Sequence, residues 1–229
     1  MHTKTIAMTD QELHQLCQEE ASRHDCFLCR PSARLLVDCS GEHYAVAGLG
    51  PLTDGYMLVA TKAHVERLGR SIESASSFAD YVQSIRAVLA SEWGGCLLTE
   101  HGNMPVCGIE SDHSVHCFHP HVLLFPGQHS IRAEAERYFE RRGTEFTTLA
   151  SAFERGAQLQ QYLLISETDQ NFSLYEPVDG LPRQFARALV AESLGAVERA
   201  SWRDFPDINS TIKNVGRVRR LLDRAHKRK

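Results

Sequence analysis

"HCFHPHVLLFPG", residues 116–127, places three histidines within six positions, two of them on either side of one proline, and closes with an apolar run before Pro-Gly. The length and alternation of residues 117–125 predict a β-strand, on which side chains two positions apart share a face. His119 and His121 would then be neighbours about 7 Å apart. Six of the chain's 12 histidines lie between residues 101 and 129, more than core packing explains, so we expect chemistry in this region.

The segments around this stretch alternate between strands and helices. A hairpin is predicted from ARLLVD and HYAVAGL around CSGE, and a buried strand from YMLVAT. A long helix follows, with apolar residues at helical spacing and two glycines at its end. In chain order the predicted elements are a helix at 9–25, strands at 33–38, 43–49 and 56–61, a helix at 71–92, strands at 96–101 and 117–125, a helix at 131–142, a hairpin of 161–166 and 172–177, and helices at 181–195 and 207–225.

Only one helix-length crossover lies inside the predicted sheet. The sheet should therefore be mostly antiparallel, and the fold α+β. Residues 1–130 are expected to form a core around the histidine-rich strand. Residues 131–229 are expected to form a C-terminal extension of a hairpin and helices packed on that core.

The composition is that of a globular protein. Of the 229 residues, 42% are hydrophobic and 24% charged, and the formal net charge is −4. No apolar run reaches the roughly 18 residues of a membrane span, and the first residues lack a signal-peptide pattern, so we expect a cytoplasmic protein without a membrane partner. Residues 213–229 include eight Lys or Arg, but apolar residues at helical spacing among them favour an amphipathic helix over a nucleic-acid surface.

Cys26 and Cys29 form the sequence CFLC after the first predicted helix. Two cysteines at this spacing fit one side of a tetrahedral zinc site. A redox pair is the alternative, but it would follow a strand and precede a helix, and here the order is reversed. The seven cysteines, without an export signal, favour reduced thiols or metal ligands over disulfides. Candidates for the remaining ligands are His64, His113, His116, His119 and His121.

Four segments in order carry a resemblance to a known family: CFLC, the strand pair, GPLTDGYMLVATKAHVERL and HPHVLLFPG. They resemble the histidine triad (HIT) superfamily, whose pattern is a Pro-x-x-x-Gly-His loop, a strand, Pro-Lys-x-His and later His-φ-His-φ-His-φ-φ-Pro, where φ is apolar. The resemblance covers about residues 24–127. Its His-Pro-His arrangement is similar to that of galactose-1-phosphate uridylyltransferase and diadenosine tetraphosphate phosphorylase. It implies an HIT-like, mostly antiparallel sheet with a long helix packed on it.

Two registers of the triad are possible. With Cys117 first, His119 is the nucleophile and His121 the third member; with His119 first, His121 is the nucleophile and Leu123 the third member. The resemblance favours the second register, because the family's closing proline lies seven residues after the first histidine, as Pro126 does after His119. In zinc-containing members the first histidine is also a metal ligand. The implied ligands of the zinc are Cys26, Cys29, His64 and His119.

The resemblance also implies a two-step reaction. Neutral His121 attacks the α-phosphorus of a nucleotide or nucleotide conjugate, and a second acceptor resolves the nucleotidyl-histidine. The other ring nitrogen must be held by an acceptor, commonly a backbone carbonyl, which the pattern does not identify. Four protein ligands leave no open position on the zinc, so the metal is expected to be structural. Many family members are homodimers, and a homodimer is expected here.

Leu123 is the departure from the family pattern, because leucine cannot donate a hydrogen bond to phosphate where the family has His or Gln. Losing such a donor can cost on the order of a hundredfold in rate. The loop at 103–116 and the residues after the strand offer replacements, and the predicted substrate-binding residues are Asn103, Ser114, His116 and Gln128. Arg183 and Arg187, on the helix predicted at 181–195, are either phosphate ligands or surface residues.

The predicted function is that of a nucleotidyl hydrolase or nucleotidylyltransferase acting through His121. The alternative is a nucleotide-binding regulatory protein of the same fold with weakened catalysis, as Leu123 suggests. Zinc-dependent redox chemistry or nucleic-acid binding, based on CFLC and the basic tail, ranks last. The base, the leaving group and the acceptor stay open.

Overall fold

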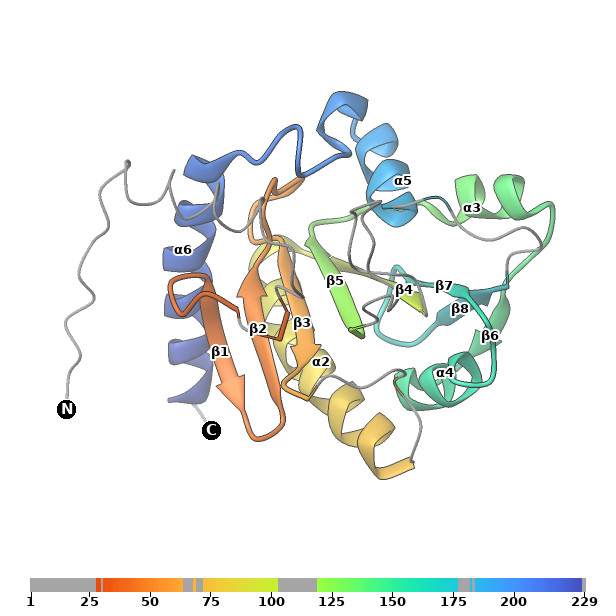
Figure 1. Cartoon of the computed structure of the whole chain (residues 1–229), viewed down its shortest axis with the longest axis horizontal. Coiled ribbons are helices and arrows are strands. Elements are labelled where there is room, and N and C mark those ends of the chain that lie inside the picture. The colour runs from red at the N-terminus through yellow and green to blue at the C-terminus, as the bar shows by residue number, and fades with distance from the viewer. Residues whose placement is uncertain are drawn as a thin grey trace, which may run out of the picture.

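A computed structural model describes residues 28–29, 31–63, 68, 72–102, 119–176, 182 and 184–227. In this part of the chain eight strands, five α-helices and one 3-10 helix are found (Figure 1). The predicted helix at 9–25 lies outside the described residues. In chain order the elements are β1 Leu36–Ser40, β2 His43–Ala47, β3 Met57–Thr61, α2 Ile72–Trp93, β4 Cys96–Gly102, β5 His121–Pro126, α3 Arg132–Phe139, β6 Thr144–Phe146, α4 Leu149–Gly156, β7 Tyr162–Ser166, β8 Phe172–Tyr175, α5 Phe185–Ser193, the 3-10 helix η1 Val197–Arg199 and α6 Ile208–His226.

The strands form one sheet in the order β1-β2-β3-β5-β4-β7-β8-β6, and every neighbouring pair is antiparallel. This confirms the predicted α+β class with its antiparallel sheet. Both predicted hairpins, β1-β2 and β7-β8, are present. The sheet continues across the predicted boundary at residue 130, because β7 pairs with β4.

The pairing register divides the sheet into two faces. On one face α2 packs: the Phe78 ring lies 5.3 Å from the His43 ring of β2. On the other face lie α5 and α3, since Phe185 stacks near His101 of β4 and Phe139 stacks on Tyr175 of β8. We call this second face the α5 face. His121 and Leu123 belong to it, because the pairing register places them on the same face as His101.

The long helix α2 forms as its apolar spacing predicts, and its apolar side is buried. It ends at Gly94, which has a φ of 76° and donates its N–H to Ala90 O at 2.8 Å. Arg86 links this helix to two strands. Its Nε donates to Cys96 O at 2.8 Å and its Nη2 to Ser166 O at 2.7 Å, with Nη1 3.0 Å from Ser166 Oγ.

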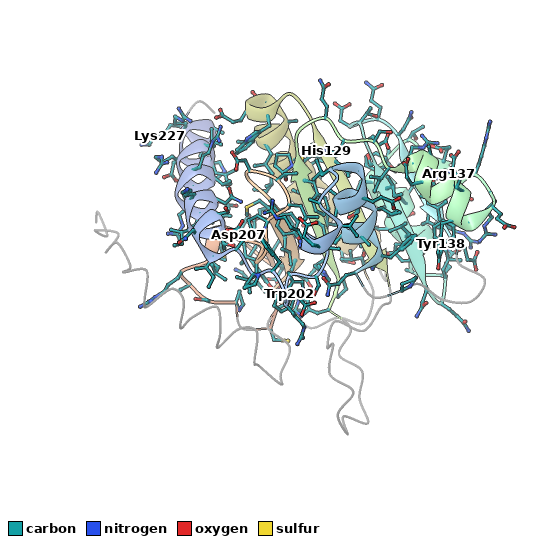
Figure 2. All side chains as sticks on the ribbon, turned by 90° about the horizontal axis from the view of Figure 1, so that it is seen from above. His129, Arg137, Tyr138, Trp202, Asp207 and Lys227 are labelled. Carbon is teal, nitrogen blue, oxygen red and sulfur yellow. The ribbon has the colours of Figure 1, made fainter. Side chains whose placement is uncertain are left out.

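The helix α6 lies beside β1 at one end of the sheet, and α3 and α4 lie at the other end (Figure 1). Asp207 and Lys227 mark the two ends of α6 in Figure 2. As predicted, the apolar residues of α6 are buried: Val215, Val218, Leu221 and Leu222. Two of its basic residues bind within the chain, because Arg217 pairs with Glu92 at 3.0 Å and Arg219 donates to backbone carbonyls near β1.

Three expectations about the elements were wrong or incomplete. The strand β5 begins at His121, although 117–125 was predicted; residues 119–120 are described and lie outside it, and 117–118 are not described. The short strand β6 and the helix α4 were not predicted. The signal for α4 was present, because Thr148 caps the helix by accepting the Ser151 N–H at 3.2 Å. No helix among the described residues is both long enough and apolar enough to cross a membrane.

A carboxyl group is buried in the sheet beneath α4. Glu100 of β4 is 1% exposed and accepts a hydrogen bond from Tyr162 Oη at 2.8 Å. Burial raises the pKa of Glu100 to about 8, and the Tyr162 hydrogen bond lowers it by less. The Tyr162 ring needs the two glycines beside it, since a Cβ on Gly102 or Gly156 would meet the ring closer than 3.0 Å. The carboxyl is therefore mostly neutral in the folded chain at pH 7.

We expect Glu100→Gln to remove a pH dependence of stability. Above pH about 4.5 the unfolded chain has lost the proton that folded Glu100 keeps up to pH about 8, so the wild type loses stability as the pH rises between these values. Glutamine keeps an acceptor for Tyr162 and cannot ionise. The free energy of unfolding in urea should be measured at pH 5 and at pH 8. From pH 5 to pH 8 it should change in favour of the variant, relative to the wild type, by more than about 1 kcal/mol.

The matched control is Glu192→Gln, which changes an exposed glutamate of α5. In this control the free energy of unfolding should change between pH 5 and pH 8 by the same amount as in the wild type. If Glu100→Gln tracks the wild type at both pH values, the buried carboxyl has no such effect.

Candidate functional site

The candidate site lies where β5 begins, between β3 and β4. His121 is the first residue of β5 and pairs with Ala60 of β3. On the other side Leu123 pairs with Thr99 of β4, and continuing this antiparallel register by two residues places His101 opposite His121. Residues opposite each other on antiparallel strands have their side chains on the same face, with Cα atoms about 4.5–5.5 Å apart.

The His119 ring is held at both of its nitrogens. Its Nε2 lies 2.8 Å from Thr61 O, and because a carbonyl only accepts, Nε2 carries the proton. Its Nδ1 lies 3.6 Å from Cys29 Sγ, so the Nδ1 lone pair is directed at this sulfur. The side chain is 2% exposed. A ring buried and bound in this way cannot reach a phosphorus atom.

The Cys29 and His119 pair has the dimensions of a zinc site. With Zn–S of about 2.3 Å and Zn–N of about 2.1 Å, two ligands of a tetrahedral zinc stand about 3.6 Å apart, and this is the separation of Cys29 Sγ and His119 Nδ1. Zinc-bound histidines usually donate the other ring N–H to a carbonyl or carboxylate, as His119 does to Thr61. The other two predicted ligands, Cys26 and His64, lie outside the described residues, within which no group of three potential ligands is found.

His121 has the opposite tautomer. Its Nδ1 donates to the carbonyl oxygen of His119 at 3.0 Å, which leaves Nε2 without a proton. The side chain is half-buried. Burial lowers the pKa of His121, and the hydrogen bond to His119 raises it by less, so the ring is neutral at pH 7. The acceptor that sequence reasoning required but did not identify is the backbone of residue 119.

Leu123 is part of the core and not of the site. It is 9% exposed and lies between Leu58 and Thr99 on the two neighbouring strands. A polar side chain at position 123 would be buried between Leu58 and Thr99. The departure from the family pattern at 123 thus matches its surroundings in the sheet.

His101 was not among the predicted site residues, although it belongs to the histidine cluster. Its Nε2 accepts the backbone N–H of Ala186 at 2.9 Å, and its ring stacks with Phe185 at 6.3 Å between centroids. Burial is the main cause that lowers the pKa of His101 to about 3, and the nearby His121, which disfavours a second positive charge, is the smaller cause. The missing signal was the register between β4 and β5, which the local pattern of either strand does not contain.

Of the remaining predicted substrate-binding residues, the structure describes only Gln128, and it does not lie at the site. Gln128 is exposed beyond the far end of β5 and donates to Gly94 O at 3.3 Å. Asn103, Ser114 and His116 lie outside the described residues. Arg187, considered as a phosphate ligand or a surface residue, is 3% exposed and donates to the carbonyls of Gly50, Arg199 and Ala200. Its side chain is therefore buried and not at the surface, and Arg183 is not described.

Two of the solved structures to which this chain is similar show the extent of the likeness. One is described as a hypothetical histidine triad nucleotide-binding protein from Sulfolobus tokodaii strain 7; the similarity covers 44% of this chain and 68% of that protein, at 22% identity and a TM-score of 0.35. The other is a yeast Ap4A phosphorylase in complex with AMP; the similarity covers 76% of this chain and 78% of that protein, at 13% identity and a TM-score of 0.38. No protein-family model and no curated protein matches the chain. Both structural similarities are distant, and the assignments below therefore rest on the contacts of this chain.

Proposed function

We propose that this protein is a nucleotide-processing enzyme, a nucleotidyl hydrolase or nucleotidylyltransferase, that acts at the α-phosphate through a covalent nucleotidyl-His121 intermediate. The observation that carries the proposal is the 3.0 Å hydrogen bond from His121 Nδ1 to His119 O. It supplies the tautomer in which Nε2 holds a free electron pair. Nucleophilic histidines need this arrangement, because only an unprotonated nitrogen attacks phosphorus.

The surroundings of the two histidines support the same division of roles. His119 has both nitrogens occupied and is 2% exposed, whereas His121 is half-buried with one nitrogen bound. The register with His119 as nucleophile would require the more deeply buried and fully bound ring to react. We therefore assign His121 as the nucleophile and His119 as a metal ligand.

The reaction proceeds in two balanced steps. His121 Nε2 forms a bond to the α-phosphorus, while the bond from phosphorus to the leaving-group oxygen breaks and that oxygen leaves with the electron pair. In the second step an oxygen of water or of a phosphate-bearing acceptor attacks the phosphorus. The P–N bond then breaks, and its electron pair returns to Nε2. The acceptor decides whether the enzyme is a hydrolase or a transferase.

A structural zinc held by Cys26, Cys29, His64 and His119 belongs to this proposal. Support comes from the 3.6 Å between Cys29 Sγ and His119 Nδ1 and from the carbonyl that holds the other nitrogen of His119. When bound, the metal would stiffen the backbone at His119, whose carbonyl oxygen sets the His121 tautomer. A homodimer, in which two copies of the chain each carry one such site, is the oligomeric state that we propose.

The second candidate function is a nucleotide-binding regulatory protein with weakened catalysis. It is favoured by Leu123, which puts a core side chain at the position of the third polar residue. The two candidates differ in whether a phosphorus-nitrogen bond forms.

Incubation with an α-³²P-labelled dinucleoside polyphosphate, followed by an alkaline quench, should leave label on the wild-type protein. His121→Ala should lose all of it, because no other described ring nitrogen on this face combines exposure with a free electron pair. His129→Ala, which changes a histidine beyond the far end of β5, is the matched control and should label as the wild type does.

Label on His121→Ala would contradict the choice of nucleophile. Tight nucleotide binding without label or product, for every nucleotide of a panel with each base, would favour the regulatory protein.

Metal analysis of protein purified without chelator should find one zinc per chain. Cys29→Ala and His119→Ala should each lose it and lower the thermal midpoint by at least about 5 °C, because a structural zinc contributes directly to folding. Cys39→Ala, which removes an exposed cysteine of β1, is the control and should keep the metal. Zinc-free wild type with an unchanged midpoint would leave the Cys29 thiol as a simple hydrogen-bond donor to His119.

A further inference from the structure

Four residues adjoin His121 on or beside the α5 face. Ala60 pairs with it across β3, His101 lies opposite it when the register of β4 and β5 is extended beyond Thr99 and Leu123, and His119 and Leu123 flank it along its own segment. Ala60 has no polar side-chain atom. Leu123 has none either, and it is buried in the core. Both nitrogens of His119 are engaged. Among these four, His101 alone can present a hydrogen-bond donor toward a group bound at His121.

The tautomer of His101 is set by helix α5. Because Nε2 accepts the N–H of Ala186, the neutral ring carries its proton on Nδ1. Burial lowers the pKa of this histidine to about 3, so the ring stays neutral and acts as a donor without a charge. His101 and His121 thus face the same region with complementary groups, an N–H on one ring and a free electron pair on the other.

We propose that His101 is a catalytic residue whose Nδ1–H donates a hydrogen bond to a non-bridging oxygen of the phosphoryl group that His121 attacks. This inference rests on the proposed function and deepens it. His101 then takes over, from the neighbouring strand, the task that a polar residue at position 123 would have had. Such donors stabilise the charge that develops on the phosphoryl oxygens.

The contact between His101 and α5 has a structural role as well, which an experiment must separate from catalysis. Gln184, the residue that caps α5, makes no side-chain capping bond and has a φ of 55°. His101 accepts one of the first free N–H groups of the helix instead. Figure 1 shows α5 near β4, the strand that carries His101. Loss of His101 could therefore lower activity simply by displacing α5.

Two substitutions separate the roles because each keeps one half of the imidazole. His101→Asn places an amide nitrogen near the position of Nδ1 and has nothing at the position of Nε2. His101→Gln places an amide oxygen near the position of Nε2, where it can accept the Ala186 N–H, and has no donor at the position of Nδ1. The first variant keeps the donor and the second keeps the helix contact.

The rate of label transfer to His121 is measured in a single turnover, per folded protein, together with the thermal midpoint. We expect His101→Gln to keep the midpoint and to lose about a hundredfold in rate, in kcat rather than in KM. We expect His101→Asn to stay within about tenfold of the wild-type rate and to lower the midpoint.

The opposite order, a slow His101→Asn and a wild-type rate for His101→Gln, would show that His101 only docks α5 and would overturn the inference while leaving the proposed function intact. Absence of label in the wild type with every nucleotide tested would overturn both. A KM effect alone would also contradict the inference, since a donor that acts in the transition state changes kcat.

Discussion

The antiparallel pairing of β5 with β3 on one side and with β4 on the other is the constraint on which the rest of the molecule depends. It pairs His121 with Ala60 and, by extension of the register beyond Thr99 and Leu123, brings His101 to its other side. Residues 122 and 124 are turned toward α2, while 121 and 123 lie on the α5 face. A shift of one residue would exchange the two faces, burying His121 beneath α2 and moving Val122 to the site. Fold and site are therefore set by the same hydrogen-bonded ladder.

Local patterns were enough to predict most of the scaffold. The spacing of Phe78, Val82 and Ile85 defines α2, and the glycines after it define its end. The two hairpins followed from apolar runs separated by turn residues. The strand β6 could not be found in this way, because its three residues alternate weakly and its strand conformation comes from pairing with β8. The start of α4, by contrast, does have a local signal, because Thr148 is a favourable N-cap residue directly before Leu149.

In the candidate site, too, local spacing predicts some residues and not others. The different roles expected of His119 and His121 depend on spacing within one segment, and the geometry of both rings agrees with that expectation. His101 comes from another strand, and its position opposite His121 depends on a register that neither segment encodes alone. Gln128 shows the converse: it is close to His121 in sequence, but the extended strand from His121 to Pro126 spans about 17 Å and places Gln128 beyond its far end.

The guanidinium of Arg86 links the parts of the chain before and after residue 130. Arg86 is 3% exposed and belongs to α2. Its guanidinium donates to the carbonyl of Cys96 at the start of β4 and to the carbonyl and hydroxyl oxygens of Ser166 at the end of β7. Separating the segment after residue 130 from the one before it would remove the two acceptors that Ser166 supplies to this cation and leave only Cys96 O, and a buried charge that loses its partners costs several kcal/mol. The two segments are thus thermodynamically coupled through one side chain, and the chain is expected to unfold in a single cooperative transition with no stable half-sheet intermediate.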